Sequence, residues 1–154
     1  MRRKNQRGLT LVELIVAFTI MSLLTAMAVP LARYKVRRDK ERELRYALRE
    51  MRAAIDRYKD LSDQGMLGPP KLDSDGYPES LDILVEGKKL SGTVDKKIRF
   101  LRRIPKDPMT NSYSWGMRSM QDDPTSTSWG GQNVFDVFTK SLDKAADGTS
   151  YSEW

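Results

Sequence analysis

The sequence predicts an α+β fold in which a long N-terminal helix, partly membrane-spanning, packs on a head with a small antiparallel β-sheet. Three observations support this prediction. Residues 9–32 form an apolar run in which Glu13 is the only ionisable side chain. A helical stripe of apolar residues follows between residues 44 and 58, and strand-like runs come only after Pro105. The length of 154 residues suits one head domain and one membrane helix.

The apolar run is long enough to cross a bilayer, because a helix of about 20 apolar residues spans the hydrocarbon core. A charged side chain in such a helix costs about 2.5–3.5 kcal/mol on insertion scales. Glu13 therefore requires a partner or a functional reason. The alternative is that Glu13 is protonated, or reaches the membrane surface, in a plain single-pass anchor.

A basic leader precedes the run, with a glycine at the junction. Its charged residues are Arg2, Arg3, Lys4 and Arg7. The following segment, Gly8-Leu9-Thr10-Leu11-Val12-Glu13, resembles the N-terminal signal of type IV pilins and of type II secretion pseudopilins. The resemblance implies that a membrane prepilin peptidase cleaves between Gly8 and Leu9 and methylates the new amino terminus. Leu9 stands where the family more often has Phe, and it keeps the apolar character.

Cleavage would place a new cation at Leu9, at the edge of the apolar layer. Glu13 of a neighbouring subunit is then a natural counter-ion, since opposite charges attract more strongly in a low dielectric than in water. This pairing would favour a homopolymeric filament. Two other interpretations stay open: a secretory signal cut at Ala26-Met27-Ala28, and an ordinary signal anchor. Basic residues flank both ends of the run, so charge does not determine its orientation.

The helix is predicted to continue to about Ser62. Apolar residues recur on one face at three- and four-residue steps: Leu44, Ala47, Leu48, Met51, Ala54, Ile55 and Tyr58. From Leu9 to Ser62 this helix would reach on the order of 80 Å. Its other faces carry mixed charges between residues 37 and 50, which form either a solvated face or contacts between subunits. Pro30 lies inside the helix and is either a static kink or, as the resemblance implies, a segment that loses helicity during assembly.

Four segments are expected: a leader (1–8), a transmembrane and polymerisation helix (9–32), its amphipathic continuation (33–63) and a globular head (64–154). In the head, a short helix should run from Tyr77 to Val85 with Pro78 in its first turn. Residues 87–95 are predicted to be a loop, and residues 97–104 a short element of uncertain type. Antiparallel strands are expected near residues 113–117 and 133–140, separated by a polar loop at 122–131.

The second half carries its own resemblance. Tyr77-Pro78 before the short helix, Ile104-Pro105-Lys106-Asp107-Pro108 and Asn111-Ser112-Tyr113 resemble the major pseudopilin of type II secretion, the G component, in a pilin-like fold. Met109-Thr110 replace the family's usual Trp-Gly. The absence of cysteine also leans away from disulfide-stapled pilins.

The resemblance implies a subunit of a pseudopilus that helps to drive protein secretion across the outer membrane. It implies a single-pass protein of the bacterial inner membrane with its C-terminal head in the periplasm. The implied partners are further copies of the chain, prepilin peptidase, minor pseudopilins, membrane lipid, and an inner-membrane platform with its ATPase. The alternative is a type IV or competence pilin for adhesion, motility or DNA uptake.

Many members of the family bind calcium in a C-terminal loop. The corresponding carboxylates here are Asp143 and Asp147, with Lys144 between them, whereas Ca²⁺ prefers six to eight oxygen ligands. The open alternatives are a calcium site and a plain turn before a C-terminal segment anchored by Tyr151 and Trp154. No other cofactor is expected.

Composition argues against an enzyme and against nucleic-acid binding. The chain has no histidine and no cysteine, so the commonest general base and the strongest nucleophile are absent. Ser141-x-x-Lys144 matches a serine–lysine pattern without its companion motifs. The formal net charge of +6 falls to +2 when the leader is removed, which leaves little basic excess for nucleic acid.

Overall fold

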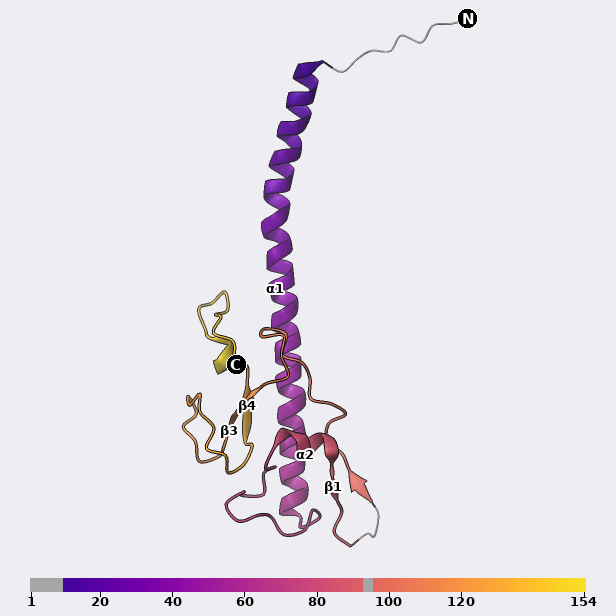
Figure 1. The fold of residues 1–154 in the computed structure, drawn as a ribbon, viewed down its shortest axis with the longest axis vertical. Helices are drawn as coiled ribbons and strands as arrows, with labels where there is room; N and C mark the ends of the chain where they lie inside the picture. The colour runs from indigo at the N-terminus through magenta and orange to yellow at the C-terminus, as the bar shows by residue number, and fades with distance from the viewer. Residues whose placement is uncertain (1–9, 93–95) are drawn as a thin grey trace, which may run out of the picture. The chain divides into compact units, whose positions relative to one another are not determined.

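The computed structural model describes residues 10–92 and 96–154 (Figure 1). Its elements in chain order are α1 (Leu11–Asp63), α2 (Leu81–Glu86), β1 (Lys88–Lys89), β2 (Lys97–Ile98), β3 (Gly116–Arg118), β4 (Asp136–Phe138) and a 3-10 helix, η1 (Tyr151–Glu153). The chain divides into two compact units, with the boundary in the sequence between Asp39 and Lys40. Together these elements confirm the predicted α+β architecture.

The long helix ends where the sequence predicts. The N–H of Met66 donates to the carbonyl of Leu61 (3.0 Å), and the N–H of Gly65 donates to the carbonyl of Ser62 (2.9 Å). This pair of bonds is a Schellman motif, which needs a residue with positive φ just past the helix. Gly65 has φ of 70°, a conformation that costs glycine little because it lacks a Cβ.

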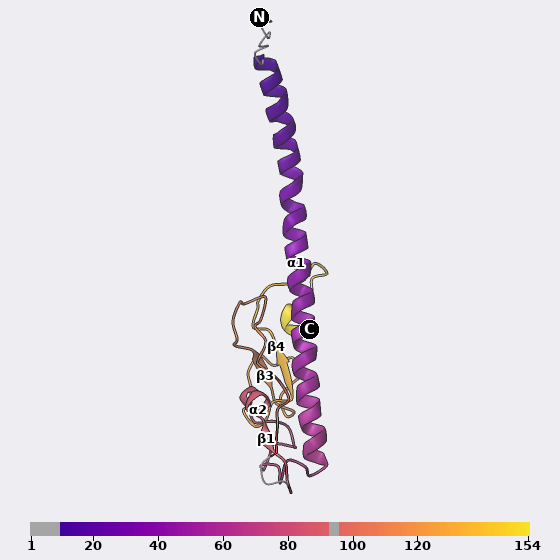
Figure 2. The same cartoon turned by 90° about the vertical axis from the view of Figure 1, so that its right-hand side faces the viewer.

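The C-terminal part of α1 supplies one wall of the head's core. The predicted apolar stripe is buried: Leu44, Ala47, Leu48, Met51, Ala54, Ile55 and Tyr58 are each at most 5% exposed. They pack with apolar residues that follow in the chain, among them Leu84, Leu101, Trp115, Val134, Val137 and Tyr151. Figure 2 shows α2 and the strands on one side of this part of the helix. The amphipathic prediction is therefore confirmed.

The short helix begins later than expected. α2 starts at Leu81 with Ser80 as its N-cap, and the extended backbone of Ser80 (φ −154°, ψ 161°) separates it from Pro78. Pro78 is therefore outside the helix, and its placement in the first turn was wrong. The physical reason is a competing hydrogen bond. The Pro78 carbonyl accepts the N–H of Val134 at 2.7 Å, which ties Pro78 to the segment that precedes β4.

Four short strands form two antiparallel pairs. β1 pairs with β2, with Lys88 opposite Ile98, so residues 88–89 are not the loop that the sequence suggested. β3 pairs with β4, with Gly116 opposite Phe138. β3 and β4 are shorter than the strands predicted near residues 113–117 and 133–140. β4 lies within its predicted range, whereas β3 is shifted toward the C-terminus. Glycine is required at position 116 because a Cβ there would collide with the ring of Phe138.

Candidate functional site

The N-terminus of α1 is closed by a reciprocal cap between Thr10 and Glu13. The Glu13 Oε2 accepts the backbone N–H of Thr10 at 3.0 Å and its hydroxyl at 3.1 Å. The N–H of Glu13 in turn donates to Thr10 Oγ1 at 3.3 Å. This arrangement is a capping box, in which a threonine and a glutamate three residues later satisfy each other's free backbone donors.

The capping role of Glu13 was missed at the sequence level, although Thr-x-x-Glu before an apolar run is its signature. In the single chain Glu13 has a local partner in Thr10. Its second oxygen, Oε1, has no hydrogen-bond donor among residues 10–92 and 96–154. Pairing of this oxygen with an amine of another subunit stays a prediction, and Gly8 and Leu9 lie outside the described residues.

The first part of α1 is the one helix of the described chain that is long and apolar enough to cross a membrane, with a mean hydropathy of 2.3 over its best window. Large apolar side chains project outward on it; Phe18 is 74% exposed. Two threonines are accommodated because their hydroxyls bond to the carbonyl four residues earlier, Thr19 to Ile15 (2.7 Å) and Thr25 to Met21 (2.8 Å). The segment therefore has no unsatisfied threonine hydroxyl.

Pro30 lies inside α1, and the backbone is helical on both sides of it. Proline has no N–H, so the carbonyl of Ala26 lacks its usual intrahelical donor. The helix is locally weakened there without being interrupted. Both interpretations of Pro30, a static kink and a segment that unwinds on assembly, are compatible with this arrangement.

In the head, Asp107 organises the loop whose sequence carries the second resemblance. Its carboxylate is fully buried and accepts the N–H of Met109 (2.9 Å) and the hydroxyls of Thr110 (2.8 Å) and Thr139 (2.6 Å). Asn111, with φ of 56°, supplies the left-handed residue of the same turn. The Asp-Pro-x-x-Asn pattern thus has a structural role, which is to tie residues 107–112 to the chain after β4.

A cluster of two arginines and one aspartate joins α1, the β3–β4 pair and the C-terminal residues. Asp136 accepts Arg52 Nε at 2.7 Å and Arg118 Nη1 at 3.3 Å. Arg52 also donates to the backbone oxygens of Val137 (3.2 Å) and Trp154 (2.7 Å), and Arg118 donates to that of Ser152 (3.3 Å). Each arginine thus holds the last residues of the chain against the head.

Aromatic contacts reinforce this attachment of the C-terminus. The hydroxyl of Tyr151 donates to Glu41 on α1 at 2.7 Å, and the Arg45 guanidinium lies 4.1 Å from the centre of the Trp154 ring. Tyr151 and Trp154 pack edge to face at 4.9 Å. The predicted anchoring of the C-terminal segment by these two residues agrees with the structure.

The calcium candidates lie in a turn stabilised by the protein itself. Asp147 Oδ1 accepts the hydroxyl (2.7 Å) and the N–H (3.0 Å) of Thr149, and these bonds lower the pKa of Asp147. The backbone carbonyl of Asp143 accepts the N–H of Tyr151. Within residues 10–92 and 96–154, no three carboxylate, histidine or cysteine side chains are grouped to hold a metal. These residues fit a turn better than a calcium cage, and calcium at Asp143 and Asp147 stays a prediction.

The same turn accounts for the serine of the serine–lysine pattern. Ser141 Oγ accepts the N–H of Asp143 at 3.2 Å, and the N–H of Ser141 donates to Thr139 Oγ1 at 3.1 Å. Ser141 is 7% exposed. A buried hydroxyl that closes a turn is poorly placed to attack a substrate.

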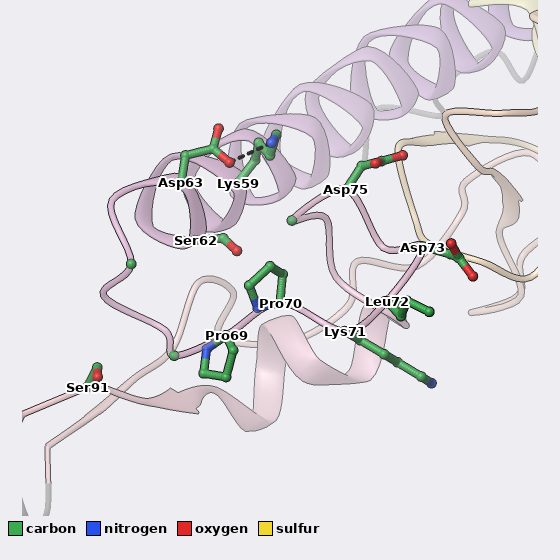
Figure 3. Close-up of a pocket in the computed structure, with 13 residues that line it drawn as sticks. Lys59, Ser62, Asp63, Pro69, Pro70, Lys71, Leu72, Asp73, Asp75 and Ser91 are labelled. Atoms are coloured by element: carbon green, nitrogen blue, oxygen red, sulfur yellow. Dashed lines mark hydrogen bonds and ion pairs between the residues drawn. The ribbon is translucent and has the colours of Figure 1, made fainter.

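An open cleft of about 840 Å³ follows the end of α1 (Figure 3). On its helix side Lys59 bonds to Asp63 at 2.6 Å, and this hydrogen bond raises the pKa of Lys59. On its loop side Asp73 and Asp75 have positive φ, and Asp75 accepts Gln121 Nε2 at 2.6 Å. These bonds hold a turn at residues 73–76, and they bring together no nucleophile with a base.

Comparison with known proteins agrees with both halves of the chain. Residues 3–29 match the prokaryotic N-terminal methylation motif. The chain is 30% identical over 122 residues to type II secretion system core protein G of Pseudomonas aeruginosa, which covers 75% of this chain and 76% of that protein. It is 29% identical over 119 residues to the core protein G of Klebsiella michiganensis, with 73% and 75% covered. No solved structure gives a significant match.

Proposed function

Because the chain belongs to the family of type II secretion system core protein G, the pseudopilins, we propose that it is the structural subunit of a pseudopilus. In this proposal copies of the chain polymerise into a periplasmic filament that helps to move proteins across the outer membrane. Its similarity to core protein G over three quarters of its length carries the proposal. The site supports a structural role, since its polar clusters stabilise turns and attach the C-terminal residues to the head.

We propose further that the chain is processed before it assembles. The methylation motif supports cleavage by prepilin peptidase between Gly8 and Leu9, with N-methylation at Leu9. Residues 9–32 would then serve as the transmembrane and polymerisation segment of a single-pass inner-membrane protein, with the head in the periplasm. Mass spectrometry of the mature N-terminus tests this step. A chain that keeps the arginine-rich leader, or that starts after Ala28, would contradict it.

The outward apolar surface of α1 supports polymerisation through this helix. Leu11, Phe18 and Leu31 are each about 70% exposed, and such a continuous apolar surface needs lipid or other helices around it. Lipid would cover it in the membrane pool, and neighbouring subunits would cover it in the filament. Minor pseudopilins and an ATPase-driven inner-membrane platform are the partners that this assembly requires.

The local cap at Thr10 makes it possible to separate two roles of Glu13. Gln at N3 keeps a capping box but carries no charge, whereas Ala at the N-cap removes the cap and leaves the charge of Glu13 in place. If Glu13 pairs with the amine of another subunit, Glu13→Gln abolishes filaments and secretion, and Thr10→Ala lowers them only slightly. Both variants should still insert in the membrane, as should Glu13→Ala.

The measurement is the yield of sheared filaments and of secreted substrate, with membrane fractionation as the control. Normal assembly of Glu13→Gln would refute charge pairing between subunits. Loss of filaments in Thr10→Ala together with normal assembly of Glu13→Gln would indicate that Glu13 acts through the helix cap alone.

A further inference from the structure

A basic segment follows the apolar part of α1 directly. Residues 33–38 contain four lysines and arginines and no acidic residue, and the first carboxylate after Glu13 is that of Asp39. Residues 41–50 are balanced, with three basic and three acidic side chains. The positive excess is thus concentrated at the end of the apolar run. Three of its side chains are exposed and form no ion pair within residues 10–92 and 96–154, and we call them the basic collar: Arg33, Lys35 and Arg38.

The basic collar lies at the depth where a membrane surface would cross α1. The helix is continuous from Leu11 through this segment. From Glu13 to Arg33 it rises about 30 Å at 1.5 Å per residue, which is about the thickness of the hydrocarbon core. Tyr34 is 65% exposed, and tyrosine is enriched at membrane surfaces because its ring is apolar and its hydroxyl is polar. An apolar run that fills the core therefore places the collar among the lipid headgroups.

The basic collar is spread around the helix instead of forming one face. At about 100° per residue, Arg33 lies on one side of α1, and Lys35 and Arg38 lie on the opposite side. A single protein partner docked on the helix would face only one of these sides. Lipid headgroups surround a membrane helix on every side, and long basic side chains can extend along the helix to reach them. A lipid surface therefore fits all three side chains.

The proposed orientation of the chain gives a second reason to expect a ligand for these charges. Basic residues next to a membrane helix favour the cytoplasmic side, so a basic collar in the periplasm disfavours the proposed orientation. A compensating interaction is then required. Anionic headgroups supply one, because they attract lysine and arginine side chains that lie near the membrane surface.

We propose that the basic collar binds the phosphate groups of anionic phospholipids in the leaflet at the C-terminal end of the apolar run. These lipids gather around each chain in the membrane pool. That this leaflet is the periplasmic one rests on the proposed function. The contact with anionic lipid follows from the charge, the depth and the distribution of the collar around the helix.

The lipid selectivity of the full chain tests the contact. The chain is reconstituted in phosphatidylcholine vesicles, and electron paramagnetic resonance compares the association of spin-labelled phosphatidylglycerol and phosphatidylcholine with it. Phosphatidylglycerol should be favoured about fivefold, the factor that one basic residue near an anionic surface contributes. Arg33→Gln/Lys35→Gln/Arg38→Gln should lower this preference to less than about twofold, because glutamine keeps a good helix propensity and carries no charge. The basic leader is the same in every variant, so the comparison isolates the collar.

Two control variants separate lipid binding from other effects of charge. Lys89→Gln/Lys97→Gln/Arg99→Gln removes three exposed charges from the head and should keep the preference. Arg33→Lys/Arg38→Lys should also keep it, since a headgroup attracts either cation, whereas a bidentate arginine pair with a protein carboxylate would be weakened. A preference that survives loss of the collar, or that falls equally in the head variant, would overturn the proposal.

The absence of native cysteine allows a measurement at the collar itself. Val36 lies within the basic segment and is 57% exposed, so Val36→Cys can carry a nitroxide label. In vesicles of phosphatidylglycerol and phosphatidylcholine, the label should broaden the phosphorus NMR signal of phosphatidylglycerol more than that of phosphatidylcholine. Replacement of the collar by glutamine should remove the difference. Equal broadening of the two signals beside the unmodified collar would refute the contact.

Failure of the lipid contact is distinguishable from failure of the proposed function. Both measurements use vesicles without any secretion apparatus, so their outcome does not depend on a pseudopilus. A collar variant that keeps its lipid preference but yields no filaments would show that the collar binds protein instead, which overturns the lipid contact and leaves the pseudopilus proposal intact. If the unmodified chain gives no filaments in its own host, the proposed function itself fails.

Discussion

Replacement of Asp136 by alanine tests the ion cluster that holds the C-terminus. The change removes the only carboxylate that pairs with Arg118 within the described residues, and the Arg118 side chain is only 10% exposed. Loss of one partner of a fully buried pair costs about 3–5 kcal/mol. The Asp136 side chain is 23% exposed, so solvent screens part of the charge, and we expect a cost of about 2–3 kcal/mol.

For a head of this size each kcal/mol corresponds to a shift in Tm of about 3–5 °C, so Asp136→Ala should lower the Tm by about 6–15 °C. Tryptophan fluorescence of the full chain in detergent measures this shift, because Trp115, Trp129 and Trp154 all lie in the head. Asp123→Ala, at an exposed aspartate outside the cluster, is the control and should melt within about 2 °C of the unmodified chain.

The cluster predicts a further distinction. Asp136→Asn keeps the shape and one acceptor oxygen but removes the charge, so its Tm should lie between those of the unmodified chain and Asp136→Ala. If the Tm of Asp136→Ala equals that of the Asp123→Ala control, the two arginines are held by their backbone acceptors alone, and the reasoning from charge is refuted.

Three other predictions concern the core, the metal and the pH response. Leu48→Ala, in the buried stripe of α1, should destabilise the head by about 2–5 kcal/mol, whereas Leu24→Ala in the exposed apolar segment should leave the head's Tm unchanged; equal melts would contradict the assigned core. EDTA should not shift the Tm of the head, since Asp147 is held by Thr149, and a fall of several degrees that calcium reverses would establish a calcium site. The N–H groups of Ser119 and Gly130 hold the pKa of Asp122 below its usual 3.8. The loop between β3 and β4 therefore gains stability that is present above pH 3.8 and is lost as the pH falls through the lowered pKa. Tryptophan fluorescence between about pH 5 and 2 should show this loss, and Asp122→Asn should abolish it.

The long helix and its buried face could be predicted because their signals are periodic. Alternation of three- and four-residue steps between Leu44 and Tyr58 is what one face of a helix against a core requires, and Gly65 marks the stop. The apolar run before it is recognised by length alone. These features depend on residues near one another in the chain, which is why the sequence suffices.

The parts that were missed depend on contacts between distant residues or on polar geometry. Arg52 and Asp136 are 84 positions apart, and no local pattern in the sequence indicates that they pair. β1 consists of two lysines, so it lacks the apolar alternation of a strand and is defined only by its partner β2. The start of α2 was misplaced because the bond from Val134 to Pro78 is invisible in the sequence.

The attachment of the chain's last residues to the middle of α1 has a mechanical consequence. Glu41, Arg45 and Arg52 hold Tyr151 and Trp154 along more than two helical turns. A force that pulls along the helix would load these bonds together, in shear, rather than peel them apart one by one. The head should therefore resist traction on its helix well, and single-molecule pulling should show a lower rupture force in Arg52→Ala.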